Sequence, residues 1–535
     1  MNFDRKGLQI ASELGIDQVL LNIREKFGTD SLGPKVSVAN DITSFELKEE
    51  DRKGDVLLPP IEGGHVGNIQ RAGILAHAFR SRGYRPIMYL CNNDLNLCHP
   101  RGKNRDDRSQ CALCHFKGNK HLQAFGIDHI SFEEVLPKNY QPPEVSEYDD
   151  LRAVEYKNVP VADFVTGSAR RLLKQYRLDL EDPSVRSLYE RLLESSMKLV
   201  DLTLETMSQF EVECVLSNHH AYVYGGTILS TADQNDIPSY CYGGTSRDNT
   251  VCFGQTSTRT SSMYDTDEEF VRSRLDEPLS NEEGDTADSL MRARRTGEDR
   301  FEKFPKESDS SFSTADSTLN VGIFTNLVWD ASIVGAQPLF EDYFRWISET
   351  IETLKDVDGV EVILKTHPAE ALRGTNESVY DWIHEEYQPL PSNLSVVEPN
   401  TDFDPYDMME ALDAGIVYNS TVGMEMAYYG KPVIVAGATH YRGYGFTYDS
   451  ESIEQYRSLL ESIDDLECTD EMEELARRYV YFYLYEKHIP VPGASKIPGK
   501  DEYPHVQHSD IGPGAEQFDN LVRSVIEGRP VVRPE

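Results

Sequence analysis

Residues 55–91 have the sequence DVLLPPIEGGHVGNIQRAGILAHAFRSRGYRPIMYLC, which begins with an apolar run closed by prolines at 59–60. A glycine-rich turn follows, and then a stretch, 69–83, whose apolar residues recur at helical spacing and which ends at Gly83. A second apolar run, 85–91, completes the pattern. Strand, turn, helix and strand form a βαβ unit, whose strands lie parallel in one sheet, so this stretch predicts an α/β fold.

The same alternation recurs twice along the chain. Residues 212–244 predict a strand, a helix from near Gly225 and another strand, after a largely helical stretch at about 160–210. Beyond residue 318, strands are predicted at 320–326, 360–368, 394–399, 414–419 and 432–437, with helices between them. We therefore predict two Rossmann-like, doubly wound domains that face each other across a ligand-binding cleft.

Changes in composition suggest the domain boundaries. We expect an N-terminal extension (1–50), an N-terminal domain with a cysteine cluster (51–254) and an acidic helical or linker segment (255–318). A C-terminal Rossmann-like domain follows (319–475), and the final helices (476–535) can cross back to the first domain.

The charge balance excludes some partners. The chain has 91 acidic against 53 basic residues, a net charge of −38, which repels nucleic acid and anionic membranes. With 33 Arg against 20 Lys, this acidity predicts a halophilic, salt-adapted protein, although ordinary acidity is the alternative. No long apolar run, no signal-peptide core and only eight cysteines in 535 residues predict a cytoplasmic protein without a transmembrane segment.

Polar side chains follow three of the predicted C-terminal strands. Because the carboxyl ends of parallel strands share one edge of a sheet, we expect these side chains to lie together, and helix N-termini and cations at such an edge bind phosphate. The alternative for Ser420 and Thr421 is a helix cap without a ligand. The predicted donor-binding residues of these stretches are Lys365, His367, Ser420, Thr421, Gly423, His440, Tyr441 and Arg442. Asn326, after the first strand, is either a further ligand contact or a cap.

Three motifs resemble the capsule polysaccharide biosynthesis proteins, a family that includes the bacterial capsule β-Kdo transferases, and more distantly the GT-B sialyltransferases. They are KTHP (365–368), YNSTVGMEMAYYGKPVIVAG (418–437) and HYRGYGFTYD (440–449), and the resemblance covers about 320–450. It implies a GT-B fold and a nucleotide sugar in the C-terminal domain, with His367, Ser420 and Thr421 near its phosphate and Glu425 toward its ribose. Tyr444 replaces a Trp or Lys that is frequent in the family, which leaves the donor sugar open.

The N-terminal domain offers candidate acceptor groups. A carboxylate or histidine is needed to deprotonate an acceptor hydroxyl if the reaction inverts the anomeric centre, and the turn after the first strand supplies Glu62 or His65 as that base. Asn68, His219, His220 and Tyr222 are the predicted acceptor-binding residues. A structural, hydrogen-bonded role is the alternative for each histidine, and a retaining reaction requires no such base.

We predict a metal-independent GT-B glycosyltransferase that transfers a sugar from a nucleotide-sugar donor to a saccharide or lipid-linked saccharide during surface polysaccharide assembly. His367, the helix terminus at Ser420 and Arg442 would stabilise the departing phosphate. The alternatives are a nucleotide-sugar epimerase or a glycerophosphotransferase of the same fold, and a non-catalytic protein of glycan assembly.

Four of the eight cysteines form the pattern C-x6-C-x12-C-x2-C, at Cys91, Cys98, Cys111 and Cys114. Four thiolates satisfy tetrahedral zinc, so the pattern predicts a structural zinc site. An iron–sulfur cluster or four reduced thiols are the alternatives. With all four positions filled, such a metal has no place for a catalytic water.

Overall fold

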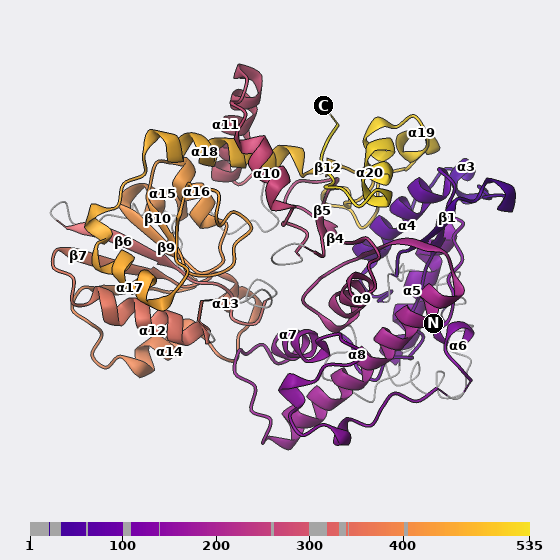
Figure 1. The fold of residues 1–535 in the computed structure, drawn as a ribbon, viewed down its shortest axis with the longest axis horizontal. Helices are drawn as coiled ribbons and strands as arrows, with labels where there is room; N and C mark the ends of the chain where they lie inside the picture. The colour runs from indigo at the N-terminus through magenta and orange to yellow at the C-terminus, as the bar shows by residue number, and fades with distance from the viewer. Residues whose placement is uncertain are drawn as a thin grey trace. The chain divides into compact units, whose positions relative to one another are not determined.

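The computed structural model describes residues 21, 34–59, 62–99, 109–138, 140–257, 262–298, 318–330, 339–340, 342–400 and 405–534 (Figure 1). The chain divides into two compact units. Unit 1 comprises Met1–Leu172, Asp179–Tyr264 and Lys487–Glu535, and unit 2 comprises Leu173–Leu178 and Asp265–Glu486. Most of the predicted N-terminal extension lies outside the described residues.

The sheet of unit 1 has the strand order β12-β5-β4-β3-β1-β2. Four strands are parallel, namely β1 (Gly54–Leu57), β2 (Tyr84–Ile87), β3 (Val212–Ser217) and β4 (Ser239–Gly244). Two more strands, β5 (Thr250–Gln255) and β12 (Ile489–Pro490), extend the sheet in antiparallel fashion. The strand order reverses between β1 and β3, and in open α/β sheets such a reversal is where ligands bind, beyond the carboxyl ends of the strands.

Helices of unit 1 come from both ends of the chain. Helix α4 (Val66–Arg80) buries Ile69, Ile74 and Phe79 in the core of the sheet, and α20 (Glu516–Ile526) packs Phe518 and Leu521 into the same core. The C-terminal segment thus contributes a strand and a helix to unit 1. The other α-helices among the described residues of unit 1 are α3 (Asn40–Thr43), α5 (Ser109–Ala124), α6 (Phe132–Val135), α7 (Val161–Leu173), α8 (Pro183–Gln209), α9 (Val223–Asp233) and α19 (His508–Ile511).

The sheet of unit 2 is parallel throughout, in the order β11-β10-β9-β6-β7-β8. Counted along the chain this is the 3-2-1-4-5-6 order of a Rossmann sheet, with its reversal between β6 and β9. The prediction of two doubly wound α/β domains is confirmed, while the cleft between them stays a prediction. The strands are β6 (Leu319–Phe324), β7 (Val360–Lys365), β8 (Leu394–Val397), β9 (Ala414–Val417), β10 (Val433–Val435) and β11 (Tyr448–Asp449).

Two helices from the acidic segment 255–318 belong to unit 2. They are α10 (Glu268–Leu275) and α11 (Asn281–Thr296), and both pack against α18 (Asp470–Tyr481) (Figure 1). A π-helix, Phe482–Glu486, continues α18. The remaining α-helices in the part of unit 2 that the structure describes are α12 (Tyr343–Leu354), α13 (Ala369–Arg373), α14 (Val379–Glu386), α15 (Pro405–Ala411), α16 (Val422–Tyr428) and α17 (Ile453–Glu461).

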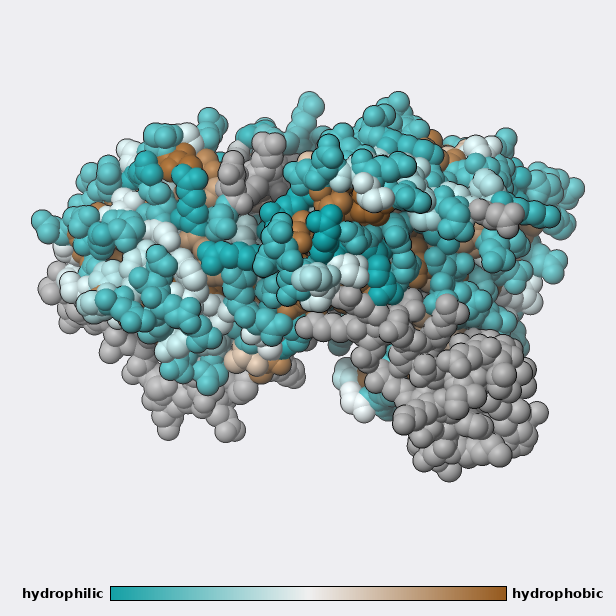
Figure 2. Space-filling view, turned by 90° about the horizontal axis from the view of Figure 1, so that it is seen from below, coloured by the Kyte–Doolittle hydropathy of each residue, from teal (hydrophilic) through white to brown (hydrophobic). Residues whose placement is uncertain are grey.

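The described surface is polar. Figure 2 shows a face on which hydrophilic side chains predominate and apolar ones form small, separate patches. Leu372, 61% exposed, is the one large apolar side chain that stands out among the described residues. Within the described ranges, no helix combines the length and the apolar composition that crossing a bilayer requires.

Candidate functional site

Two asparagines are hydrogen-bonded to each other at the point where the strand order of the unit 2 sheet reverses. Asn326, just after β6, donates from Nδ2 to the Asn419 carbonyl (2.8 Å) and accepts from the Asn419 N–H (3.2 Å). Its own N–H donates to the Tyr343 hydroxyl, 2.5 Å away. Because both ends of the amide group are engaged, Asn326 fixes the loops after β6 and β9 relative to each other and has a positioning role.

Tyr441 holds the loop after β9 in place. The Tyr441 hydroxyl donates to the Ser420 carbonyl (2.5 Å), and a Cβ at Gly423 would lie 2.3 Å from that hydroxyl. Gly423 is therefore needed to make room for a buried tyrosine. Ser420 Oγ accepts from the Val422 N–H (3.3 Å), while Thr421, the N-cap residue of α16, makes no side-chain capping hydrogen bond.

Glu425 is fully engaged inside unit 2. Its Oε1 accepts from Arg294 Nη2 (2.5 Å) and Nε (3.1 Å), and its Oε2 accepts from the Tyr406 hydroxyl (2.6 Å). The Glu425 side chain is 5% exposed and that of Arg294 16%. These contacts make Glu425 the partner of a buried cation from α11.

The loop after β10 uses its polar groups in the same way. Arg442 donates to the carbonyls of Gly437 (3.2 Å) and Ser450, which fastens the loop across β10 and β11. His440 bonds through Nδ1 to the Tyr479 hydroxyl (2.8 Å) and stacks on Tyr483, with ring centroids 4.2 Å apart. Gly443 and Gly445 have φ of 87° and 86°, values at which glycine avoids a strain that other residues incur.

Three titratable groups lie at or just beyond the carboxyl end of β7. Lys365 donates to the carbonyls of Thr366 (3.0 Å) and Glu398 (3.1 Å), and burial lowers the pKa of its ammonium group to about 8. His367, half-buried, accepts the Ala369 N–H at Nδ1 (3.1 Å). Burial raises the pKa of Glu370 to about 7, and its Oε2 accepts from Ser378 Oγ (2.9 Å) while the buried Oε1 has no hydrogen-bond partner.

The reversal point of the unit 1 sheet holds an acid–histidine pair. Glu62, 5% exposed, lies in the turn after β1, and His65 is the N-cap residue of α4. His65 Nδ1 lies 3.0 Å from Glu62 Oε2, while the His65 side chain is 41% exposed. Contact with the Glu62 carboxylate raises the pKa of His65 above 6.5, although burial opposes the shift. The contact is an ion-pair distance, since neither Glu62 oxygen makes a hydrogen bond, and it leaves Nε2 as the imidazole nitrogen that can act as a general base.

An aromatic and basic cluster lies beyond β3. His219 has φ of 60°, and its ring centroid is 5.6 Å from that of Tyr222. Arg171, on α7, donates to the Tyr222 hydroxyl (2.7 Å) and covers its ring at 5.0 Å. Burial, reinforced by the charge of Arg171, lowers the pKa of His219 to about 3, so this imidazole stays neutral. His99 packs edge-on against Tyr222 at 4.8 Å.

Two further predicted acceptor residues make other contacts. Asn68 Oδ1 accepts from Arg71 Nη2 (2.6 Å). The backbone of His220, with that of His219, donates to the buried sulfur of Cys241. Asn68 therefore positions a cation, while the His220 backbone joins the loop to β4.

Sequence comparison identifies part of unit 2. Residues 346–475 match the family model described as capsule polysaccharide biosynthesis protein. This segment carries the capsule polysaccharide biosynthesis pattern. The predicted resemblance is confirmed over this segment, which contains the loops after β7, β9 and β10 but neither Asn326 nor unit 1. No protein of curated function matches the chain in sequence.

Solved structures with similar folds include a beta Kdo 2,4 transferase, KpsC of Thermosulfurimonas dismutans, at 14% identity over 59% of this chain and 88% of that one, with a TM-score of 0.35. The spinosyn rhamnosyltransferase SpnG is 10% identical over 81% of this chain and 95% of its own, with a TM-score of 0.27. A UDP-GlcNAc 2-epimerase from Neisseria meningitidis is 10% identical over 79% and 94%, with a TM-score of 0.24. At such low scores, the fold description rests on the strand orders of the two sheets.

The cysteine cluster lies outside the capsule-type segment, in unit 1. Burial raises the pKa of Cys91 to about 12, and Cys114 Sγ accepts the Gly64 N–H at 2.9 Å, beside the turn that carries Glu62. Cys98 and Cys111 are half-buried. In the part of the chain that the structure describes, no three His, Cys, Asp or Glu side chains are placed to hold a metal ion. The zinc site stays a prediction.

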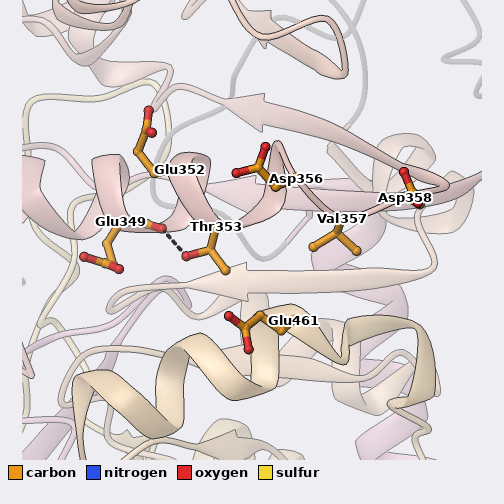
Figure 3. Close-up of a pocket in the computed structure, with 7 residues that line it drawn as sticks. All are labelled: Glu349, Glu352, Thr353, Asp356, Val357, Asp358 and Glu461. Carbon is orange, nitrogen blue, oxygen red and sulfur yellow. Dashed lines mark hydrogen bonds between the residues drawn. The ribbon is translucent and has the colours of Figure 1, made fainter.

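A hollow of about 620 Å³ in unit 2 is lined by carboxylates (Figure 3). Glu349 and Glu352 come from α12, and Asp356 and Asp358 precede β7, so the hollow lies at the amino ends of the strands. The capsule-type loops follow the carboxyl ends, at the opposite edge of the sheet. The hollow is therefore a feature of the acidic surface and separate from the candidate site.

Sequence reasoning did not assign Arg71, Arg171 or Glu370 to a site. Arg71 lies in the first turns of the helix that follows the glycine-rich turn, and that position is a usable signal. Arg171 lies on a helix far along the chain, and only the fold brings it to Tyr222.

Proposed function

We propose that this chain is a glycosyltransferase that moves a sugar from a nucleotide-sugar donor to a saccharide acceptor in polysaccharide biosynthesis. The capsule-type segment of unit 2 and the two Rossmann-like sheets support this activity. The similar solved structures include proteins named as Kdo and rhamnosyl transferases, and a SpnG structure with bound thymidine diphosphate.

The observation that carries the proposal is the Glu62–His65 pair at the reversal point of the unit 1 sheet. With Nδ1 toward Glu62, His65 Nε2 accepts the proton of an acceptor hydroxyl, and the hydroxyl oxygen forms a bond to the anomeric carbon. The bond from that carbon to the donor phosphate breaks, and the nucleotide leaves with the electron pair. This chemistry inverts the anomeric centre and consumes no other reactant.

On the donor side, we assign the phosphate to the loops after β7 and β9. His367 is half-buried after β7, and Ser420 and Thr421 precede α16 at the same edge of the sheet. Lys365, whose ammonium group donates to the carbonyls of Thr366 and Glu398, adds positive charge at this edge but does not reach toward the phosphate itself. Glu425, His440, Tyr441 and Arg442 have internal partners, so we assign them to holding these loops in place.

The decisive experiment incubates the full chain with CMP-, UDP- and GDP-sugars, each with and without an oligosaccharide acceptor mixture. We expect one donor to release its nucleotide only when acceptor is present, with a heavier glycan detected by mass spectrometry. A sugar altered in the donor alone indicates an epimerase, and transfer of glycerol phosphate indicates a glycerophosphotransferase. Absence of binding to every nucleotide leaves the non-catalytic role and refutes the proposal.

We also propose that the protein acts in the cytoplasm and on a saccharide or lipid-linked saccharide. The net charge of −38 and the eight cysteines in 535 residues support a soluble, reducing setting. Fractionation of source cells tests this: recovery in the soluble fraction is expected, and release only with detergent contradicts it.

For the cysteine loop, we propose one structural zinc ion bound by Cys91, Cys98, Cys111 and Cys114. The four-cysteine pattern supports this, as does the Gly64 N–H that donates to Cys114 Sγ, since such donors stabilise a metal-bound thiolate. Metal analysis of the purified chain is expected to give about one zinc per chain. Iron in its place indicates an iron–sulfur cluster, and neither metal refutes the site.

A further inference from the structure

Arg71 is a half-buried cation with a buried Nε, and it has no acidic partner among the described residues. Its Nη2 donates to Asn68 Oδ1 (2.6 Å) and its Nη1 makes a long contact with the Ala494 carbonyl (3.4 Å). Its Nε is buried and has no hydrogen-bond partner. Across the described residues, no carboxylate lies within ion-pair distance of this guanidinium. A partly buried guanidinium with one buried N–H donor unsatisfied and no opposite charge beside it is costly, and an anion would supply both the acceptor and the charge.

Neighbouring arginines of unit 1 show the contrast. Arg82 pairs with Asp519 (2.6 Å), and Arg85 pairs with Asp55 (2.8 Å). Arg80 donates to three backbone carbonyls. In a chain with 91 acidic residues against 53 basic ones, carboxylates are plentiful, yet none is placed beside Arg71 among the described residues. These contacts are better explained by a ligand-binding role for Arg71 than by a purely structural one.

The position of Arg71 places this charge at the ligand-binding edge of the sheet. A Cβ at Gly244, the last residue of β4, would lie 3.0 Å from Arg71 Nη1. Arg71 is six residues beyond His65, on the helix that His65 caps. The carboxyl ends of β1, β3 and β4 share one edge, so Arg71 lies at the same edge as the Glu62–His65 pair.

The other described groups at this edge place no carboxylate within ion-pair distance of Arg71. Arg171 adds a second guanidinium, bound to the Tyr222 hydroxyl at 2.7 Å. His219 and His99 are neutral, because burial lowers the pKa of both imidazoles and the charge of Arg171 adds to the shift. Glu62 is the nearby carboxylate, and it faces His65.

We infer that Arg71, supported by Asn68 and Arg171, binds an anionic group of the acceptor, either a carboxylate of an acidic sugar or a phosphate of a phosphorylated one. This inference rests on the proposed function, and it makes the acceptor a charged saccharide. The guanidinium matches both groups because its planar N–H donors bind two oxygens at once.

The test measures binding to the full chain without donor, by isothermal calorimetry, using methyl glucuronide, glucose 1-phosphate and neutral methyl glucoside as probes. We expect at least one anionic probe to bind and the neutral one to bind at least about tenfold more weakly. Whichever of the two anionic probes binds more tightly shows whether the site prefers a carboxylate or a phosphate. Arg71→Gln is expected to weaken the anion about tenfold or more, with Arg71→Lys restoring part of the loss.

Arg82→Gln serves as the matched control, because Arg82 already has Asp519, and its anion binding is expected to stay within about twofold of the parent. Circular dichroism melting of each variant reports folding independently. Equal affinity in the parent and Arg71→Gln, or no preference for either anion over methyl glucoside, overturns the inference. The binding test needs no sugar donor, so the two proposals can fail separately. If the anion binds through Arg71 but no sugar is transferred, only the proposed function is refuted. If sugar is transferred but anion binding does not depend on Arg71, only this inference is refuted.

Discussion

The two sheets have comparable reversal points but use their polar residues differently. In unit 2, Asn326, Glu425 and Arg442 bind other parts of the same unit, through an amide pair, a buried ion pair and backbone carbonyls. In unit 1, His65 is 41% exposed beside Glu62, and Arg71 has a buried Nε without a partner. Residues of a recognisable sequence motif can therefore serve to hold a loop in place, while a helix residue outside any motif, such as Arg71, keeps an unused hydrogen-bond donor.

The largest effect is expected at His65. We expect His65→Gln to lower turnover by roughly 10²- to 10⁴-fold, the usual contribution of a general base. Single-turnover kinetics with saturating donor measures it. The exposed His505, bonded to Ser37, gives the control variant His505→Gln, which should keep full activity. Undiminished turnover in His65→Gln removes His65 as the base.

The pH profile sharpens the same assignment. Contact with Glu62 raises the pKa of His65, and only the neutral imidazole accepts a proton, so turnover should rise as the pH passes that raised pKa. Glu62→Gln should move this limb to lower pH. The stability contributed by the pair is present below pH 6.5 and is lost as the pH rises through the folded-state pKa. If the pH dependence of turnover is the same in the parent and in Glu62→Gln, the assignment of His65 as the base is contradicted.

Glu425 tests the structural side of the comparison. Removing one partner of the buried Arg294 pair should cost about 3 kcal/mol, because a guanidinium is left buried without its anion. Urea unfolding of Glu425→Gln measures this. Glu410, half-exposed and paired with Arg295, gives the control Glu410→Gln, which should change stability by less than about 1 kcal/mol. If Glu425→Gln is as stable as the parent but has a higher KM for the sugar donor, Glu425 binds the ribose of the donor instead.

Glu370 provides a pH-dependent test. Burial raises the pKa of this carboxyl from 4.5 to about 7, so the folded protein resists its ionisation and loses stability as the pH rises between those values. From pH 5 to 8 the parent should lose roughly 2–3 kcal/mol more than Glu370→Gln. Urea unfolding across this pH range measures the difference. Parallel stability curves would show that Glu370 ionises normally.

Gly423 tests whether its loop is shaped by packing. A Cβ would lie 2.3 Å from the Tyr441 hydroxyl, so Gly423→Ala should cost about 1–3 kcal/mol. Tyr441→Phe removes that hydroxyl, and in the double variant the penalty of the alanine should shrink, which a double-mutant cycle of unfolding free energies reveals. Strictly additive effects would indicate that the glycine serves a ligand instead.

The smallest contribution of any single residue is expected in the dependence of stability on salt concentration. A net charge of −38 makes the chain repel itself, and salt screens this repulsion. We expect the melting temperature to rise steadily with KCl concentration, as a halophilic protein requires. Differential scanning fluorimetry from low to molar KCl measures the trend. Full stability at low ionic strength would indicate ordinary acidity.

The sequence by itself determined the alternation of strands and helices, and with it the edge at which candidate residues gather. The strands predicted at 320–326, 360–368 and 394–399 appear as β6, β7 and β8, each slightly shorter. Such patterns are local, since apolar periodicity and glycine or proline boundaries act within a few residues. His367 and Ser420 could be placed at one edge of a sheet for that reason.

Only the tertiary structure decided which polar groups are already paired. Glu425 meets Arg294 across 131 positions of sequence, and the Arg71 guanidinium meets the Ala494 carbonyl across 423. The addition of β12 and α20 to unit 1 is equally non-local. Pairing of a buried charge depends on which distant segment packs beside it, and no periodicity in the chain encodes that neighbour. The sequence therefore located the edges, and packing decided which side chains there remain available to a ligand.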